Sequence, residues 1–155
     1  MKKALLLLTH LLMLALGFGL GVYALPILIA PPAPSLDQVQ AMAQSASYKA
    51  RFRRELKDSD ALHWGEGDVY VGPRAVTLAG KLAPGPDYRL YLSPQFVETE
   101  ADFQRLRPQM LHVGSVRTFS NFSVALPEGV DLARYDTVIV WCESFGQFIS
   151  AAKYR

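Results

Sequence analysis

The chain has 155 residues, of which 50% are hydrophobic, and it carries a formal net charge of +2. This length holds one domain of ordinary size plus appendages. The charge is mild and evenly spread, which argues against a nucleic-acid partner. The one local basic cluster, Arg51 to Arg54, is balanced by acidic residues over 55–60. It predicts a solvated helix face rather than a lipid-headgroup patch.

The first thirty residues form an apolar segment. Lys2 and Lys3 precede an almost uncharged run from Ala4 to Ala30, in which Pro26 predicts a kink or an early helix end. A signal-peptide core has about 7–15 apolar residues and a lipid-spanning helix about 20, so the length favours a membrane anchor. The positive-inside rule then predicts a single-pass cell-membrane protein with its C-terminal part extracytoplasmic. The residues around Ala24 would also permit cleavage, so a secreted or periplasmic protein with a processed signal peptide is the alternative.

A spacer and a helix are expected next. Pro31 to Pro34 predicts a short stiff spacer. Ser35 suits the N-cap of a helix from Leu36 to about Lys57, because apolar residues recur there at spacings of three and four. Since these are mostly alanines, the helix is expected to bury little and to act as a stalk. We therefore divide the chain into an anchor or signal segment (1–30), a spacer with linker helix (31–58) and an independently folding domain (59–155).

From Leu62 onward, short alternating runs are separated by Gly- and Pro-rich breaks, as is typical of antiparallel strands. The predicted strands are Asp68–Val71, Ala75–Leu78, Tyr88–Leu92, Met110–Val113, Phe119–Leu126, Thr137–Cys142 and Phe145–Ala152. A short surface helix is expected over Thr99–Arg107. Both faces of Thr137–Cys142 are apolar, which predicts a central strand covered on both sides. About seven strands predict an all-β fold, an antiparallel β-sandwich or barrel-like domain.

Common catalytic patterns are absent from the sequence. It contains no Gly-rich phosphate loop, no paired-Cys zinc spacing, no nucleophile elbow and no Cys-x-x-Cys-His motif for covalent haem. The sequence patterns therefore indicate neither an enzymatic activity nor a metal site. His63, Met110 and His112 are weak candidates for binding haem non-covalently, because His and Met ligate haem iron. Structural roles for all three are the simpler interpretation.

The single cysteine, Cys142, ends the predicted central strand directly after Trp141. Exported proteins usually pair their cysteines or avoid them, so a lone thiol calls for an explanation. A redox role would need a lowered thiol pKa, whereas the neighbouring Glu143 would raise it. Free cysteine is also among the most frequently buried residues. From the residues alone, a core thiol is preferred over a redox thiol.

The C-terminal part of the sequence resembles a known family. Asp131–Tyr135, then Val138–Cys142 and Phe145, resemble the C-terminal half of the DM-thirteen (electron-transfer) domain. His63 with Gly67 and the segment Gly85–Leu92 also agree, and the resemblance spans roughly residues 58 to 154.

The resemblance implies a redox role centred on Cys142, exercised with a redox partner protein. We therefore expect an extracytoplasmic, membrane-anchored electron-transfer accessory domain. The alternative is a non-catalytic extracytoplasmic binding or interaction module that holds Cys142 in its core.

Overall fold

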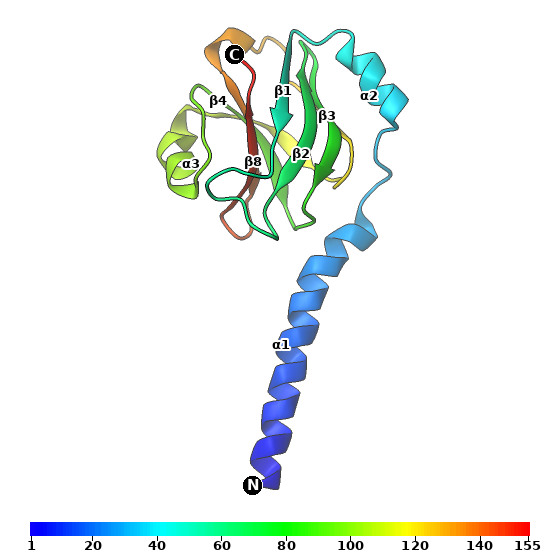
Figure 1. The fold of residues 1–155 in the computed structure, drawn as a ribbon, viewed down its shortest axis with the longest axis vertical. Helices are drawn as coiled ribbons and strands as arrows, with labels where there is room; N and C mark the ends of the chain where they lie inside the picture. The colour runs from blue at the N-terminus through cyan, green and yellow to red at the C-terminus, as the bar shows by residue number, and fades with distance from the viewer.

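The computed structural model describes residues 1–155 and shows an eight-stranded antiparallel β-sandwich with a long N-terminal helix projecting from one end (Figure 1). The strands are β1 (Tyr48–Phe52), β2 (Gly65–Val71), β3 (Ala75–Leu82), β4 (Tyr88–Ser93), β5 (Leu111–Val116), β6 (Phe122–Ala125), β7 (Thr137–Cys142) and β8 (Gln147–Lys153). The helices are α1 (Lys2–Ile29), α2 (Leu36–Ala43) and α3 (Glu100–Leu106), with single 3-10 turns η1 (Arg107–Gln109) and η2 (Leu132–Arg134).

The strands form two four-stranded sheets in the orders β1-β2-β3-β6 and β5-β4-β7-β8. The predicted β-sandwich is thereby confirmed. Every second side chain of a strand points to the same face. Side chains of the two sheets therefore meet between them in a core of 19 buried residues, which includes Leu78 of β3, Leu90 of β4 and Val140 of β7. All seven predicted strands are present, although their ends differ by a few residues.

A second, smaller core covers the outer face of the β4–β7–β8 sheet. The predicted surface helix is present as α3, capped by the Thr99 side chain. Phe103 of α3 stacks on Trp141 with ring centroids 3.9 Å apart, and Tyr91 meets Phe103 edge-on at 5.2 Å. All six residues of β7 are buried as a result. The prediction of a central strand covered on both sides is confirmed.

The linker helix differs from the prediction. Ser35 caps α2 in a capping box with Gln38, as expected, but the helix ends at Ala43 instead of near Lys57. It is also no free stalk, because Val39 is fully buried. The amide nitrogen of Asn121 donates to the Pro34 carbonyl at 3.2 Å and ties the spacer to the sandwich.

The segment after α2 is the edge strand β1, which replaces the predicted second half of the helix. Its Phe52 side chain is buried in the main core, whereas Lys49 and Arg51 point outward. Both cations bind Asp68 of β2, at 3.2 and 3.1 Å. Of the basic cluster, Arg51 thus lies on a strand, and Arg53 and Arg54 lie in the loop that follows it; none of the three lies on a helix. A domain boundary between residues 58 and 59 stays a prediction, although β1 of the sandwich precedes it.

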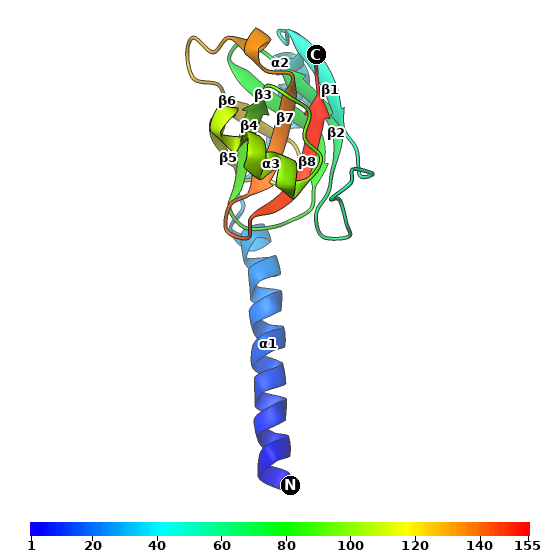
Figure 2. The same ribbon diagram turned by 90° about the vertical axis from the view of Figure 1, so that its left-hand side faces the viewer.

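Helix α1 has 28 residues, none of them buried. Its length and composition suffice to cross a membrane, a property that signal sequences near an N-terminus share. Pro26 lies inside the helix, which continues to Ile29. The sandwich sits directly against the C-terminal end of α1, and the rest of the helix projects away from it (Figures 1 and 2).

Candidate functional site

The β7–β8 turn and the loops that precede β2 and β4 meet the side of α1 at the lower end of the sandwich (Figure 2). A pocket of about 230 Å³ lies between them. We call it the thiol pocket. The lining residues used below are Val22 and Tyr23 of α1 and His63, Tyr88, Cys142 and Phe145 of the sandwich.

Cys142 is the last residue of β7, and only 2% of its surface is exposed. Its Sγ donates a hydrogen bond to the Pro86 carbonyl at 3.0 Å. Burial raises the pKa of the thiol, and the Asp87 and Glu143 carboxylates add to this, although the backbone N–H groups of residues 144 and 145 oppose it. At neutral pH Cys142 is therefore a protonated thiol rather than a thiolate.

The neighbouring carboxylate of Glu143 is engaged elsewhere. It accepts a hydrogen bond from the Tyr91 hydroxyl, and Arg107 Nη2 binds its Oε2 at 2.8 Å. Burial, followed by the contact with Glu143, raises the pKa of Tyr91. The Arg107 cation thus pairs with the carboxylate that follows the thiol in the chain.

His63 lies in the thiol pocket and is held by Asp60. The His63 Nδ1 and Asp60 Oδ2 atoms are 2.9 Å apart, and Asp60 Oδ1 accepts the backbone N–H groups of Leu62 and His63. The bond to His63 lowers the pKa of the Asp60 carboxyl. Because a carboxylate can only accept, Nδ1 is the donor in this contact, and Nε2 of the neutral imidazole is then an acceptor. The structure thus brings together two residues that the sequence identified separately, His63 and Cys142.

Tyr88 was not identified as a site residue from the sequence. Only 3% of its surface is exposed, yet its hydroxyl makes no hydrogen bond within the protein. Burial raises its pKa strongly, so the hydroxyl stays protonated. A Cβ atom on Gly85 would lie 2.4 Å from the hydroxyl oxygen, so this close approach requires glycine. The buried side-chain oxygens without a partner are those of Ser59, Thr77 and Ser150, so the Tyr88 hydroxyl is instead accessible from the pocket that it lines. The Pro84-Gly85-Pro86 run just before this core-facing tyrosine was the available signal.

The other haem-ligand candidates lie on the α3 side of the sandwich. Met110 packs against the second core, and the exposed His112 places its ring 5.2 Å from the Tyr91 ring. Neither residue lines the thiol pocket. No group of three or more His, Cys, Asp or Glu side chains is placed to hold a metal ion. The structure therefore does not unite His63 with Met110 and His112 around one iron.

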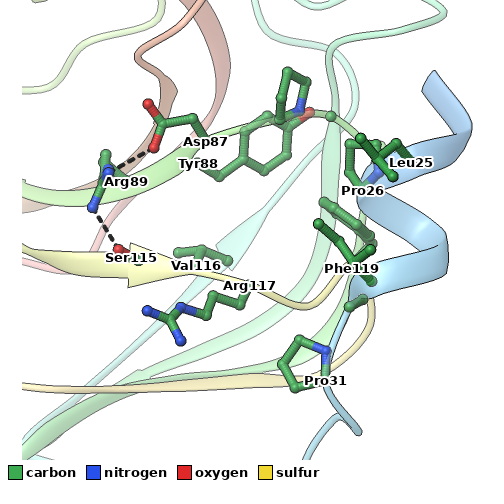
Figure 3. Close-up of a pocket in the computed structure, with 14 residues that line it drawn as sticks. Leu25, Pro26, Pro31, Asp87, Tyr88, Arg89, Ser115, Val116, Arg117 and Phe119 are labelled. Carbon is green, nitrogen blue, oxygen red and sulfur yellow. Dashed lines mark hydrogen bonds and ion pairs between the residues drawn. The ribbon is translucent and has the colours of Figure 1, made fainter. Parts of the chain in front are cut away.

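A larger cavity of about 590 Å³ adjoins the thiol pocket, beside the last turn of α1 (Figure 3). We call it the arginine pocket, because Arg89 and Arg117 line it. Arg89 binds Asp87 at 2.7 Å and Ser115 at 2.5 Å (Figure 3). Tyr88 lines both pockets, as do Gly85 and Pro86.

Comparison with known proteins identifies one family. A family model described as electron transfer DM13 matches residues 55–154, a range that includes strands β2 to β8 and the residues of the sandwich that line the thiol pocket. No curated protein matches the chain. No solved structure matches it either.

Proposed function

The chain belongs to the electron transfer DM13 family, as its resemblance predicted, and from this membership we propose that it is an extracytoplasmic, membrane-anchored electron-transfer accessory domain in which Cys142 Sγ is the working atom. Family membership supports a redox-related role. The apolar α1 helix is consistent with a membrane anchor.

The observation that carries the role of Cys142 is its position in the thiol pocket. Its surface is almost fully withdrawn from solvent, but the residue lines a cavity that also contains His63 and the unbonded Tyr88 hydroxyl. A small molecule in this cavity would reach the thiol, whereas the thiol of another protein would not. A redox partner protein would therefore act through a small carrier.

The proposed location follows from the charges at the start of the chain. Lys2 and Lys3 precede the apolar segment, so the positive-inside rule places the sandwich outside the cytoplasm. We expect a reporter fused after Arg155 to be active in the periplasm. A reporter that is active only in the cytoplasm would show the opposite topology. If the mature protein is soluble and begins near Leu25, the apolar segment is a cleaved signal peptide and not a membrane anchor.

A second candidate function is a non-catalytic binding module with Cys142 as a core residue. Its support is the 2% exposure of Cys142, the raised thiol pKa and the hydrogen bond to Pro86. A neutral, buried thiol is a normal component of a hydrophobic core. The two functions differ in whether the native fold lets a small reagent reach the sulfur.

The test compares reagents of two sizes on the folded protein and then measures electron transfer. A redox thiol should react with methyl methanethiosulfonate but not with a polymer-linked maleimide. Oxidation of the thiol to a sulfenic acid takes up the oxygen of one water, releases two protons and reduces two ferricyanide ions by one electron each. Cys142→Ala and Cys142→Ser should both abolish this ferricyanide reduction, while the control His112→Gln keeps it. A thiol that reacts with neither reagent before unfolding, or variants that still transfer electrons, would favour the binding module.

A further inference from the structure

The length of α1 fixes the level of the thiol pocket relative to a bilayer. The hydrocarbon core is about 30 Å thick, which a helix crosses with about 20 residues. Counted from Ala4, the first residue after the lysines, about 20 residues end at Tyr23. Tyrosine favours the membrane–water interface. Tyr23 lines the thiol pocket, as do Gly19 and Val22, so the pocket lies at the boundary between hydrocarbon and headgroups.

The side chains exposed on the sandwich are consistent with this position of the thiol pocket relative to the bilayer. Beyond α2, three large apolar side chains are exposed, and two of them, Leu62 (59%) and Phe145 (56%), line the thiol pocket. Arg89 and Arg117 line the neighbouring cavity beside Leu25, closer to the end of α1, where headgroups would lie. Since Arg89 is paired with Asp87, Arg117 is the cation available to headgroups, one level above the apolar groups at the hydrocarbon edge. The thiol pocket is therefore open to molecules dissolved in the lipid.

The lining of the pocket defines the chemistry of its occupant. No Lys or Arg lines the thiol pocket, so it offers a phosphate group no cation. Its free polar groups are the hydroxyls of Tyr88 and Tyr23, which can donate, and His63 Nε2, which is an acceptor when Nδ1 donates to Asp60. Its volume of 230 Å³ is below the range of about 300–1,000 Å³ for drug-sized ligands. It fits one uncharged ring that carries oxygen atoms.

We infer that the thiol pocket binds the headgroup of a membrane quinone or quinol, whose apolar tail lies along α1 in the bilayer. The choice of a redox-active ring rests on the proposed electron-transfer function. The Tyr88 hydroxyl donates to a quinone carbonyl, and His63 Nε2 accepts the hydroxyl proton of a quinol. Asp60 orients the imidazole for this contact through its 2.9 Å bond to Nδ1.

Binding is measured on the full chain in nanodiscs of neutral phospholipid, titrated with a decyl-substituted benzoquinone. Trp64 and Trp141, the neighbours of His63 and Cys142 in the sequence, report the ligand because quinones quench tryptophan fluorescence. We expect saturable quenching in the native protein. Tyr88→Phe and His63→Gln should each weaken the affinity about threefold to tenfold, the size of one lost hydrogen bond. The matched controls, Tyr70→Phe and His112→Gln, should leave it unchanged.

Three results would overturn the inference. The first is quenching that rises linearly with quinone and is equal in all five proteins. The second is saturable binding that neither Tyr88→Phe nor His63→Gln weakens. The third is competition by decane. If decane displaces the bound quinone at the same concentration as added quinone does, the pocket binds acyl chains.

The Cys142→Ala variant separates this inference from the proposed function. Because Sγ bonds to Pro86, this variant should still bind the quinone. If the native protein binds quinone but transfers no electrons, only the proposed function is refuted. If it transfers electrons without binding quinone, only the inference of a quinone site is refuted.

Discussion

At the scale of single residues, the Pro86 carbonyl determines how Cys142 responds to substitution. From the sequence, a serine in a dry core would leave its hydroxyl without a partner. In the structure, the acceptor 3.0 Å from Sγ is available to a serine hydroxyl as well. We therefore expect Cys142→Ser to cost less stability than Cys142→Ala.

Cys142→Ala leaves a small cavity and an unpaired carbonyl, which together cost about 1–3 kcal/mol. Cys142→Ser keeps the donor and should cost about 1 kcal/mol or less. Urea denaturation of both variants beside the native protein gives the comparison. A serine variant that is less stable than the alanine variant would show that the hydroxyl does not reach Pro86.

The raised pKa of Cys142 predicts a pH dependence. The folded protein holds the thiol proton more tightly than the unfolded chain does, for which the ordinary value is near 9.0. This contribution to stability is complete below that pH and is lost as the pH rises through the folded-state pKa. Alkylation by iodoacetamide should therefore show a midpoint above pH 9, and the stability of the native protein relative to Cys142→Ala should fall in the same range. A midpoint below pH 8 would mean an activated thiolate.

The sequence could predict which face of β7 Cys142 occupies, because strand alternation is a local property. It could also predict that no nearby cation lowers the thiol pKa. It could not predict that His63 and Tyr88 share a pocket with Cys142. That proximity depends on packing between α1 and segments as far along the chain as Ile149, 130 residues after Gly19, which no local pattern encodes.

At the scale of elements, β1 shows where local patterns mislead. Between residues 36 and 57 the alanines recur with helical spacing, and helix propensity favours a continued helix. The alternation of Tyr48, Ala50 and Phe52 with Lys49 and Arg51 has the period of a strand instead. Pairing with β2 decides between the two, because it buries Phe52 and provides Asp68 as a partner for both cations. Strands β2 to β8 were predictable, since Gly or Pro separates all of them except β5 from β6.

The docking of β1 and α2 predicts how truncation affects stability. A fragment of residues 31–155 should fold cooperatively, whereas residues 59–155 lack Val39 and Phe52 and leave the edge of β2 unpaired. Each buried side chain of this size contributes about 1.5–3 kcal/mol, a large share of a typical stability of about 5–15 kcal/mol.

Circular dichroism with urea denaturation measures this loss. A fragment of residues 45–155 is the matched control, because it keeps β1 and removes only α2, and its stability should be intermediate. Equal stability of the fragments that begin at 31 and 59 would make both elements dispensable, as the sequence alone suggested.

At the scale of the whole molecule, the sandwich lies against the end of α1 and is bonded to the spacer that follows it. The last turns of α1 form pockets with the lower loops, and the spacer is bonded to Asn121 on its way along the sandwich to α2 (Figure 1). A flexible tether would let the domain move away from the membrane. With α1 as the proposed anchor, the bond to the spacer would keep the sandwich close to the lipid, with Cys142 at the end nearest to it.

The last prediction tests that height. Single cysteines are introduced as Leu62→Cys, Phe145→Cys and Glu128→Cys in the full-length Cys142→Ala protein, labelled with the environment-sensitive dye NBD and reconstituted in vesicles. Residues 62 and 145 flank the thiol pocket, whereas Glu128 is exposed beyond the opposite end of β6. Lipids with a doxyl quencher near the headgroup should quench the dye strongly at 62 and 145 and weakly at 128. Weak quenching at all three positions would mean that the sandwich stands clear of the lipid, and a quinone would then have no direct path from the bilayer into the thiol pocket.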